Sequence, residues 1–156
     1  MTTALYTGSF DPVHLGHVRV IEQAARSFEA VVVAVLGNPA KTSGLLPVAE
    51  RVRLLEAATA GLDNVTCTAH HGLAVDAARE HGASTLVRSA HKEHRTELEM
   101  AAHNERLTGI PTTFISGDPD LTWVSSTVVR RLLADGDADR LRAVVPSAVA
   151  DALLSP

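Results

Sequence analysis

The stretch GSFDPVHLGH, residues 8–17, lies between a short apolar run, residues 4–6, and a helical pattern, residues 18–25. A strand, a turn and a helix start in that order form an anion-binding site, because backbone N–H groups and the positive end of the helix dipole point at one place. In such a turn Gly8 lets the backbone approach a ligand, and the Ser9 hydroxyl can bind a phosphate oxygen. The stretch therefore predicts a phosphate-binding turn at the start of a helix.

His14 and His17 are three residues apart, so in the first turn of a helix they share one face. Two imidazoles beside a phosphate can donate to its oxygens without a metal and without a carboxylate base. A His-x-x-His pair alone is more often a pair of surface residues, but the whole ten-residue string at a strand–turn–helix junction is far more specific. We therefore take His14 and His17 as candidate catalytic residues.

The string resembles the HxGH signature of the nucleotidylyltransferase superfamily. Members of that superfamily move a nucleoside monophosphate from ATP or CTP onto a phosphorylated acceptor. The resemblance implies ATP binding by Gly8, Ser9, Phe10 and His17.

Five apolar runs alternate with helical patterns, and every connection is long enough for a crossover. Residues 30–37 read as a strand buried on both faces, which is typical of a parallel sheet covered by helices. We predict a single α/β domain, residues 1–156, with a doubly wound, Rossmann-like five-stranded parallel sheet of order 3-2-1-4-5. The expected strands are 4–6, 30–37, 65–69, 85–87 and 112–115, and the expected helices are 18–25, 47–61, 73–81, 93–107, 123–133, 140–144 and 146–154.

Two cations follow strands of the predicted sheet. Lys41 comes soon after strand 30–37, and Arg88 ends strand 85–87. A lysine in a loop is usually a solvated charge, but ligands of such sheets bind beyond the carboxyl ends of the strands, at the switch between strands one and four. We therefore expect both cations to face the same crevice as the histidines.

The segment Ser125-Ser126-Thr127 begins a helix directly after Trp123-Val124. One serine would satisfy the need for a helix cap, and three hydroxyls at a helix N-terminus favour phosphate binding. The segment resembles the superfamily's second signature, ISS(S/T)xx(R/K), which holds the β and γ phosphates. The resemblance implies ATP binding by the five residues 123–127.

Three further segments resemble the phosphopantetheine adenylyltransferase family. Residues 38–41 match its N-P-x-K turn with a catalytic lysine, here Lys41, and residues 71–76 match a loop that lines the pantetheine arm. Residues 97–104 match the helix beside its adenine site, which implies a nucleotide contact for Glu97. In this family Ser9, Lys41, Leu73, Ala74 and Arg88 would bind the acceptor.

The segment after Arg88 departs from that family, which has R-G-L-R there. Ser89 stands where the family has glycine, the second arginine is missing, and only His91 or Lys92 offers a substitute cation. Neither has the planar fork of a guanidinium. Three functions therefore stay open: AMP transfer from ATP to 4'-phosphopantetheine, transfer to another acceptor or from CTP, and nucleotide binding without chemistry.

The expected reaction is in-line attack by the acceptor phosphate on the α-phosphorus of ATP. His17 and Lys41 would neutralise charge at the α-phosphate, His14 and Ser9 would support neighbouring oxygens, and Arg88 would be shared by nucleotide and acceptor. Residues 125–127 would hold the leaving pyrophosphate. Mg²⁺ would arrive on the ATP phosphates, since no cysteine cluster or His-Glu-x-x-His pattern suggests a metal site in the protein.

Composition sets the expected partners and location. A net charge of −4 gives no reason to expect nucleic acid or a membrane surface as partner, so small-molecule substrates are expected. The single cysteine, Cys67, fits a reducing compartment, and no basic-then-apolar leader or transmembrane run is present, which predicts a cytoplasmic protein. The family resemblance implies a homo-oligomer, a hexamer in that family.

Overall fold

A computed structural model describes residues 2–37, 44–90 and 94–156 of the chain. Its centre is a five-stranded sheet of order β3-β2-β1-β4-β5, with every neighbouring pair parallel. This confirms the predicted doubly wound α/β fold and strand order. The strands are β1 (Thr3–Gly8), β2 (Ala30–Leu36), β3 (Val65–His70), β4 (Thr85–Ala90) and β5 (Thr112–Ser116).

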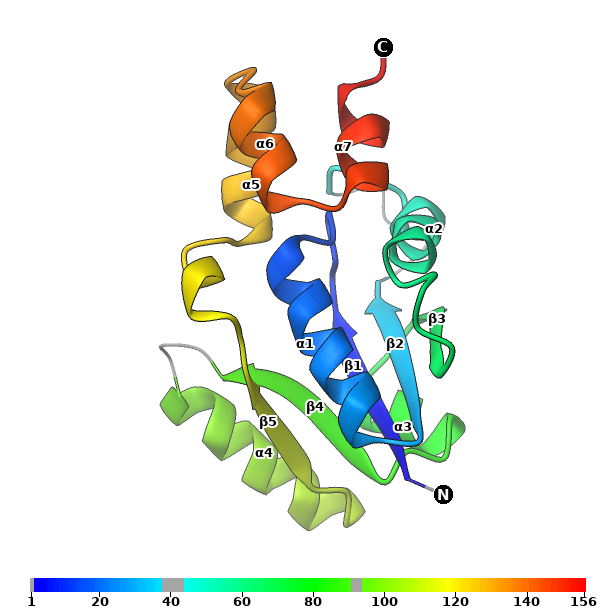
Figure 1. The fold of residues 1–156 in the computed structure, drawn as a ribbon. Coiled ribbons are helices and arrows are strands. Elements are labelled where there is room, and N and C mark those ends of the chain that lie inside the picture. The colour runs from blue at the N-terminus through cyan, green and yellow to red at the C-terminus, as the bar shows by residue number, and fades with distance from the viewer. Residues whose placement is uncertain (1, 38–43, 91–93) are drawn as a thin grey trace.

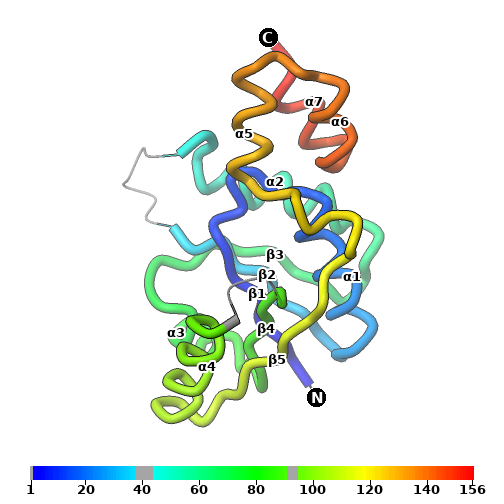
Figure 2. Tube along the Cα trace, turned by 90° about the vertical axis from the view of Figure 1, so that its left-hand side faces the viewer, coloured from blue at the N-terminus to red at the C-terminus, as the bar shows by residue number. Residues whose placement is uncertain are grey.

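Helices cover both faces of the sheet (Figure 1). In the view of Figure 2, α3 and α4 lie on one side of the strands and α1 lies on the other, while α5, α6 and α7 gather above the carboxyl ends of the strands. The helices are α1 (Leu15–Ser27), α2 (Val48–Ala58), α3 (Ala74–Glu80), α4 (His94–Thr108), α5 (Ser126–Ala134), α6 (Ala138–Val144) and α7 (Ser147–Leu154).

Two apolar cores form because successive side chains of a strand point to opposite faces. Tyr6 and Val33 belong to the larger core, which includes residues of α1, α2 and α5 to α7. Leu5, Val32 and Leu86 belong to the smaller core with Ala77 and Ala78 of α3. The central strand β1 and its neighbour β2 are thus buried on both faces, as their apolar runs predict.

Several elements begin or end at other residues than expected, and the changes in β4 and β1 involve residues of the candidate site. Strand β4 extends to Ala90, so Arg88 lies inside the strand instead of after it. Strand β1 extends to Gly8, because pairing with β2 continues to Gly8 and Val35. Helix α1 begins at Leu15 rather than at Val18. A short 3₁₀ helix, Pro119–Leu121, lies in the segment expected to be an irregular loop.

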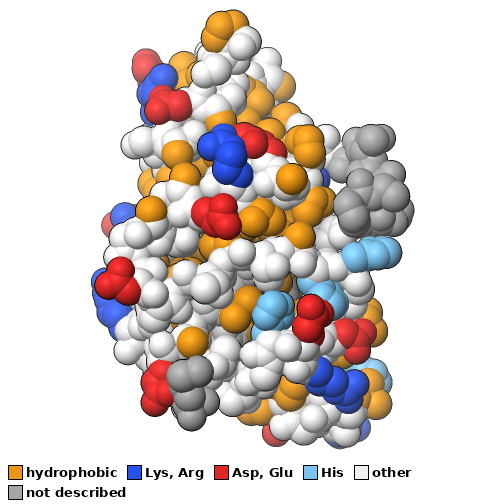
Figure 3. All heavy atoms as spheres, turned by 90° about the vertical axis from the view of Figure 1, so that its right-hand side faces the viewer, with side chains coloured by type: hydrophobic (Ala, Val, Ile, Leu, Met, Phe, Trp, Pro, Cys, Tyr) orange, Lys and Arg blue, Asp and Glu red, His pale blue; other side chains and the backbone are white. Residues whose placement is uncertain are grey.

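Figure 3 shows the face on the right-hand side of Figure 1. Acidic and basic side chains are interspersed among apolar ones there, and histidines gather toward one edge (Figure 3). Among the helices of the described ranges, none is long and apolar enough to cross a membrane.

Candidate active site

His14 and His17 cap each other at the start of α1. His14 is the N-cap residue, and its Nδ1 accepts the backbone N–H of His17 at 3.4 Å. In return the Nδ1 of His17 accepts the backbone N–H of His14 at 3.1 Å. The two rings stack with their centroids 3.6 Å apart and an angle of 24° between their planes. A side chain at Gly16 would prevent this, since a Cβ there would lie 2.9 Å from Cε1 of His14.

The cap fixes which ring nitrogen carries the proton. A neutral imidazole has one donor and one acceptor nitrogen. Because Nδ1 of both His14 and His17 accepts a backbone N–H, the proton of each neutral ring belongs on Nε2. Each ring therefore has an Nε2–H that can donate to a phosphate oxygen without first being protonated. This is the chemistry expected of the HxGH pair, and its source is the backbone of the helix start.

The rings of Phe10 and Tyr6 pack near the ring of His17. Phe10 packs edge-on against His17 with ring centroids 4.8 Å apart, and edge-on against Tyr6 at 5.4 Å. The Phe10 backbone has a φ of 47°, a left-handed conformation that few non-glycine residues adopt and that occurs at functional turns. The Phe10 ring is buried, and it contacts the His17 imidazole and lines neither cavity described below. Burial raises the pKa of Tyr6, and Arg88 opposes that rise.

The turn between β1 and α1 is held by Asp11. The Asp11 carboxylate accepts the backbone N–H groups of Leu45 and Leu46, each at 2.8 Å, and lies 3.4 Å from Nε of Arg51. Arg51 also donates to the carbonyl oxygens of Leu46 and Ser9. Both members of this ion pair are buried. Asp11 is therefore more than a turn former, because it holds the turn between β1 and α1 to the segment before α2.

The N-terminus of α5 is bonded to the same turn. Ser126 Oγ donates to the carbonyl oxygen of Pro12 at 3.0 Å, and Nη1 of Arg130 donates to the carbonyl oxygen of Asp11 at 2.8 Å. Ser125 is the N-cap of α5, and its hydroxyl accepts the backbone N–H of Val128. These contacts place the first-turn N–H groups of α5, which have no intrahelical acceptor, beside the start of α1.

Each of the three consecutive hydroxyls of this segment has a bond within the protein. Ser125 caps the helix, Ser126 binds Pro12, and Thr127 Oγ1 accepts from Nη2 of Arg130 at 3.2 Å. One serine, Ser125, is enough for the cap, as expected, and the other two hydroxyls bond to the Pro12 carbonyl oxygen and to Arg130. Their role as phosphate ligands stays a prediction.

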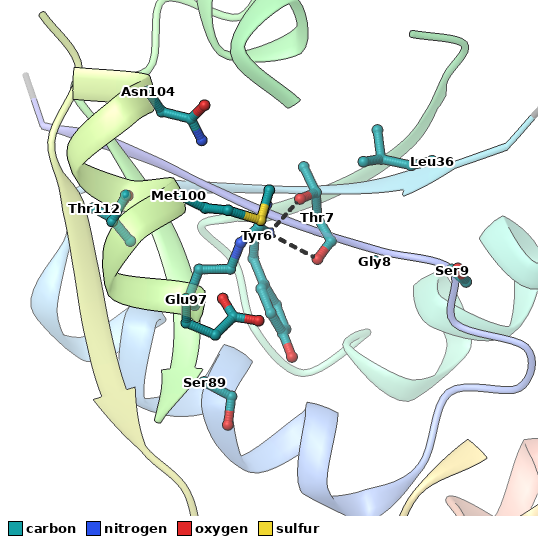
Figure 4. A pocket seen from close by; sticks show the side chains of 12 residues that line it. Tyr6, Thr7, Gly8, Ser9, Leu36, Ser89, Glu97, Met100, Asn104 and Thr112 are labelled. Atoms are coloured by element: carbon teal, nitrogen blue, oxygen red, sulfur yellow. Dashed lines mark hydrogen bonds between the residues drawn. The ribbon is translucent and has the colours of Figure 1, made fainter. Parts of the chain in front are cut away.

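Arg88 is anchored to β1. Its Nη1 donates to Oγ1 of Thr7 at 2.5 Å and to the carbonyl oxygen of Thr7 at 3.3 Å. Figure 4 shows these two bonds as dashed lines. This contact brings the cation of β4 to the carboxyl end of β1, at the switch point that the sequence predicted between these two strands.

Two cavities meet at this point. The first, called the α1-side cavity, has a volume of about 690 Å³ and is lined by His14, His17, Ser125 and Ser126 together with residues 116–119. The second, called the α4-side cavity, has a volume of about 350 Å³ and is lined by Gly8, Ser9, Arg88 and Asn104 among others. Tyr6, Ser89 and Glu97 line both cavities, so the two form one crevice at the switch point between β1 and β4.

Figure 4 shows how the α4-side cavity is built. Glu97, Met100 and Asn104 point from α4 toward Tyr6 and Thr7 of β1 (Figure 4). Leu36 of β2 lies on the opposite side of this cavity. The cavity therefore combines an arginine with carboxylate, amide and apolar groups.

Most predicted site residues converge on this crevice. Those that line one of the cavities are Gly8, Ser9, His14, His17, Arg88, Glu97, Val124, Ser125 and Ser126. Those that line neither are Phe10, Leu73, Ala74, Trp123 and Thr127. Leu73 and Trp123 are 67% and 55% exposed, and Trp123 Nε1 donates to the Asp120 carbonyl oxygen. Lys41, His91 and Lys92 fall outside the described residues.

Some lining residues had no signal in the sequence. Tyr6 lies in the expected strand 4–6 and Thr7 directly after it, with nothing to single out either, and Ser89 drew notice only as a departure from the family pattern. The Oγ of Ser89 is buried without a hydrogen-bond partner among the described residues, as is Nε2 of His70. Within those residues, no group of three or more His, Cys, Asp or Glu side chains is arranged to hold a metal ion.

Comparison with known proteins gives the family. The sequence profile of the cytidylyltransferase-like family matches residues 5–132. Phosphopantetheine adenylyltransferases of two Corynebacterium glutamicum strains, R and ATCC 13032, are each 40% identical over 153 residues, which covers 96% of this chain and 94% of theirs. Together with the paired imidazoles at a strand–turn–helix junction, these matches define a nucleotidyltransferase. The chain belongs to the cytidylyltransferase-like family, which confirms the nucleotidylyltransferase resemblance.

Solved structures agree on the fold. A proposed nicotinate-nucleotide adenylyltransferase from Vibrio parahaemolyticus superposes with a TM-score of 0.64 at 20% identity, covering 99% of this chain and 100% of that one. The lipopolysaccharide core biosynthesis protein of Thermoplasma volcanium superposes with a TM-score of 0.55 at 20% identity, covering 76% of this chain and 97% of that one.

Proposed function

We propose that the protein transfers AMP from ATP to 4'-phosphopantetheine and releases dephospho-coenzyme A and pyrophosphate, a step of coenzyme A synthesis. The 40% identity to phosphopantetheine adenylyltransferases over nearly the whole of both chains supports this acceptor. The observation that carries the proposal is the meeting of two cavities over Tyr6, Ser89 and Glu97. One chamber can take the nucleotide and the other its acceptor, with the reacting phosphates at the junction.

The nucleotide belongs in the α1-side cavity. There the Nε2–H group of His17 would donate to the α-phosphate, that of His14 would donate to a neighbouring phosphate oxygen, and the N-terminus of α5 would receive the β and γ phosphates. Trp123, Val124 and Thr127 would complete the nucleotide site. Mg²⁺ would enter with ATP as part of the substrate, bound by phosphate oxygens.

The acceptor belongs in the α4-side cavity. Arg88 and Ser9 line it and would bind the acceptor phosphate, while Leu36 and Met100 give apolar contacts for the rest of the arm. Leu73 and Ala74 would contact the acceptor from beyond the cavity, and Lys41 would bridge the two phosphates.

The chemistry needs no general base. A phosphate dianion is a competent nucleophile, so catalysis consists of positioning the two phosphates in line and neutralising the charge that develops at the α-phosphate. Preorganised donors do this without reorganisation, because the backbone of α1 already holds the imidazoles in the required tautomer.

Pyrophosphate release from a panel of acceptors, each with ATP and with CTP, tests this function. We expect release with ATP and 4'-phosphopantetheine together and with neither alone. Release only with another acceptor, or only with CTP, would assign the chain to a different branch of its family. ATP binding by calorimetry with no pyrophosphate from any pair would identify a nucleotide-binding protein without chemistry.

The same proposal includes a homo-oligomer in the cytoplasm, as a hexamer by the family resemblance. Helix α4 supports an assembly, because its large apolar residues Leu98 and Leu107, which line neither cavity, are each more than half exposed. Light scattering after size exclusion measures the assembly, and a monomeric mass at assay concentration would contradict it.

A further inference from the structure

The proposed function gives no role to Thr7, the residue that accepts both hydrogen bonds from Arg88. It is buried at the end of β1, and its side chain and its backbone carbonyl both accept from Arg88. We propose that Thr7 is a positioning residue that sets the orientation of Arg88 and thereby the affinity for the acceptor phosphate. The identity of the acceptor in this inference rests on the proposed function. The orientation of Arg88 by Thr7 does not depend on it.

The register between β1 and β4 places Thr7 beside Arg88. Tyr6 of β1 is paired with Val87 of β4, so the next residues, Thr7 and Arg88, stand side by side on neighbouring strands. Side chains alternate along both strands, and Leu5 and Leu86 point into the smaller core beside α3. Thr7 and Arg88 therefore point to the same face, which is the face of the α4-side cavity.

The bonds leave the rest of the guanidinium available. Both engage Nη1, and within the described residues no hydrogen bond or ion pair uses Nε or Nη2 of Arg88. An arginine held at one nitrogen can present the others to a phosphate at little further entropic cost, since its long side chain is already ordered. Arg88 lines only the α4-side cavity, so the effect falls on the acceptor.

The hydroxyl of Thr7 is the part that a side-chain change can remove. Its β-branched side chain is stiff at χ1, so Oγ1 stays where Arg88 needs it. Valine has the same shape without the hydroxyl, and serine keeps the hydroxyl with more freedom. The carbonyl bond at 3.3 Å survives either change, so the loss should be partial.

The kinetic test compares Thr7→Val with Thr7→Ser and with Thr3→Val. Thr3 is the matched control, because it is a buried threonine on the same strand and the same face, away from both cavities. We expect Thr7→Val to raise the KM for 4'-phosphopantetheine about tenfold, while the KM for ATP and kcat change little. Thr7→Ser should restore most of the affinity, and Thr3→Val should behave as the unaltered protein.

A double-mutant cycle separates positioning from a general structural effect. If Thr7 acts through Arg88, then Thr7→Val adds nothing to the KM of an Arg88→Ala protein. An additional tenfold rise in that background, or a rise in the KM for ATP instead of the acceptor, would overturn the inference.

Crystal structures without substrate test the structural part even if 4'-phosphopantetheine proves not to be the acceptor. We expect the Arg88 guanidinium beside Thr7 Oγ1 in the unaltered protein and displaced in Thr7→Val. A guanidinium in the same place in both would refute the role of the hydroxyl. Failure of the proposed function would appear separately, as an unaltered protein that releases no pyrophosphate with this acceptor.

Discussion

The carboxylate of Asp11 and the guanidinium of Arg51 form a buried ion pair, 3.4 Å from Oδ1 to Nε, between the β1–α1 turn and α2. Two backbone N–H groups, those of Leu45 and Leu46, complete the coordination of the carboxylate. An amide in place of this buried carboxylate would remove the ion pair and would set an NH₂ group against a backbone N–H.

Asp11→Asn should therefore lower the free energy of unfolding by about 3–5 kcal/mol, measured by urea denaturation. Asp151→Asn is the matched control, because Asp151 pairs with Arg142 on the surface at 3.4 Å and should matter by less than about 0.5 kcal/mol. Equal small losses in both variants would show that the Asp11 pair does not hold the turn.

Gly44 lies against this ion pair with a φ of +111°. A Cβ at this position would come within 2.5 Å of Nη2 of Arg51 and 2.6 Å of Oδ2 of Asp11. Gly44→Ala should destabilise the protein by more than about 1 kcal/mol, since both the backbone conformation and the space oppose a side chain. Gly61→Ala, where no heavy atom lies within 4 Å of the added carbon, should be near neutral. Equal melting temperatures for the two variants would contradict this.

His17→Ala should lower kcat by about 10²–10³-fold, the usual loss for one preorganised donor. The same change removes the acceptor of the His14 backbone N–H, so the free energy of unfolding should also fall by about 1 kcal/mol. Pyrophosphate release under saturating substrates measures the first effect and thermal unfolding the second. His103→Ala on the exposed face of α4 serves as the control, and near-normal turnover in folded His17→Ala protein would refute the assignment.

Tyr6 gives a pH prediction that can be measured directly, because it is the only tyrosine of the chain. Its folded-state pKa is raised by burial. The stability that comes from keeping it neutral is fully present below the unfolded pKa of about 10, and it is lost as pH rises above that value. Tyrosinate absorbance should therefore appear only with unfolding, and Tyr6→Phe should lose less stability than the unaltered protein between neutral and strongly alkaline pH. A tyrosinate signal near pH 10 in folded protein would contradict the buried position.

The sheet could be predicted from the sequence because β2 is a continuous apolar run, β1 contains a shorter one, and the other three strands are short apolar or alternating segments between helical patterns. Residues 30–37 and the string 8–17 carry that information locally, and the switch-point rule then places Arg88 and the histidines in one crevice. The reciprocal cap could be anticipated only in part. The spacing of His14 and His17 places them together, but the backbone bonds that set their tautomer depend on the extended conformation of His14 at the N-cap.

The remaining contacts could not be predicted, because they join segments far apart in the chain. Asp11 reads as a turn residue, and nothing near it in the sequence indicates Arg51 or the N–H groups of residues 45 and 46 as its partners. Thr7 lies just after the expected strand 4–6, and only the register of β1 and β4 shows that it stands beside Arg88. The boundary of β4 moved for the same reason, since pairing with β5 as far as Ala90 and Ser116, rather than local propensity, decides where it ends.

The hydrogen bonds from Ser126 to Pro12 and from Arg130 to Asp11 cross 114 and 119 residues of chain. They join the helix proposed to hold pyrophosphate to the turn that carries the imidazoles. Any outward motion of α5 that opens an exit for the leaving group must therefore break these bonds or pull the turn with it. Release of pyrophosphate and the return of the histidine-bearing turn to its starting position would then be coupled.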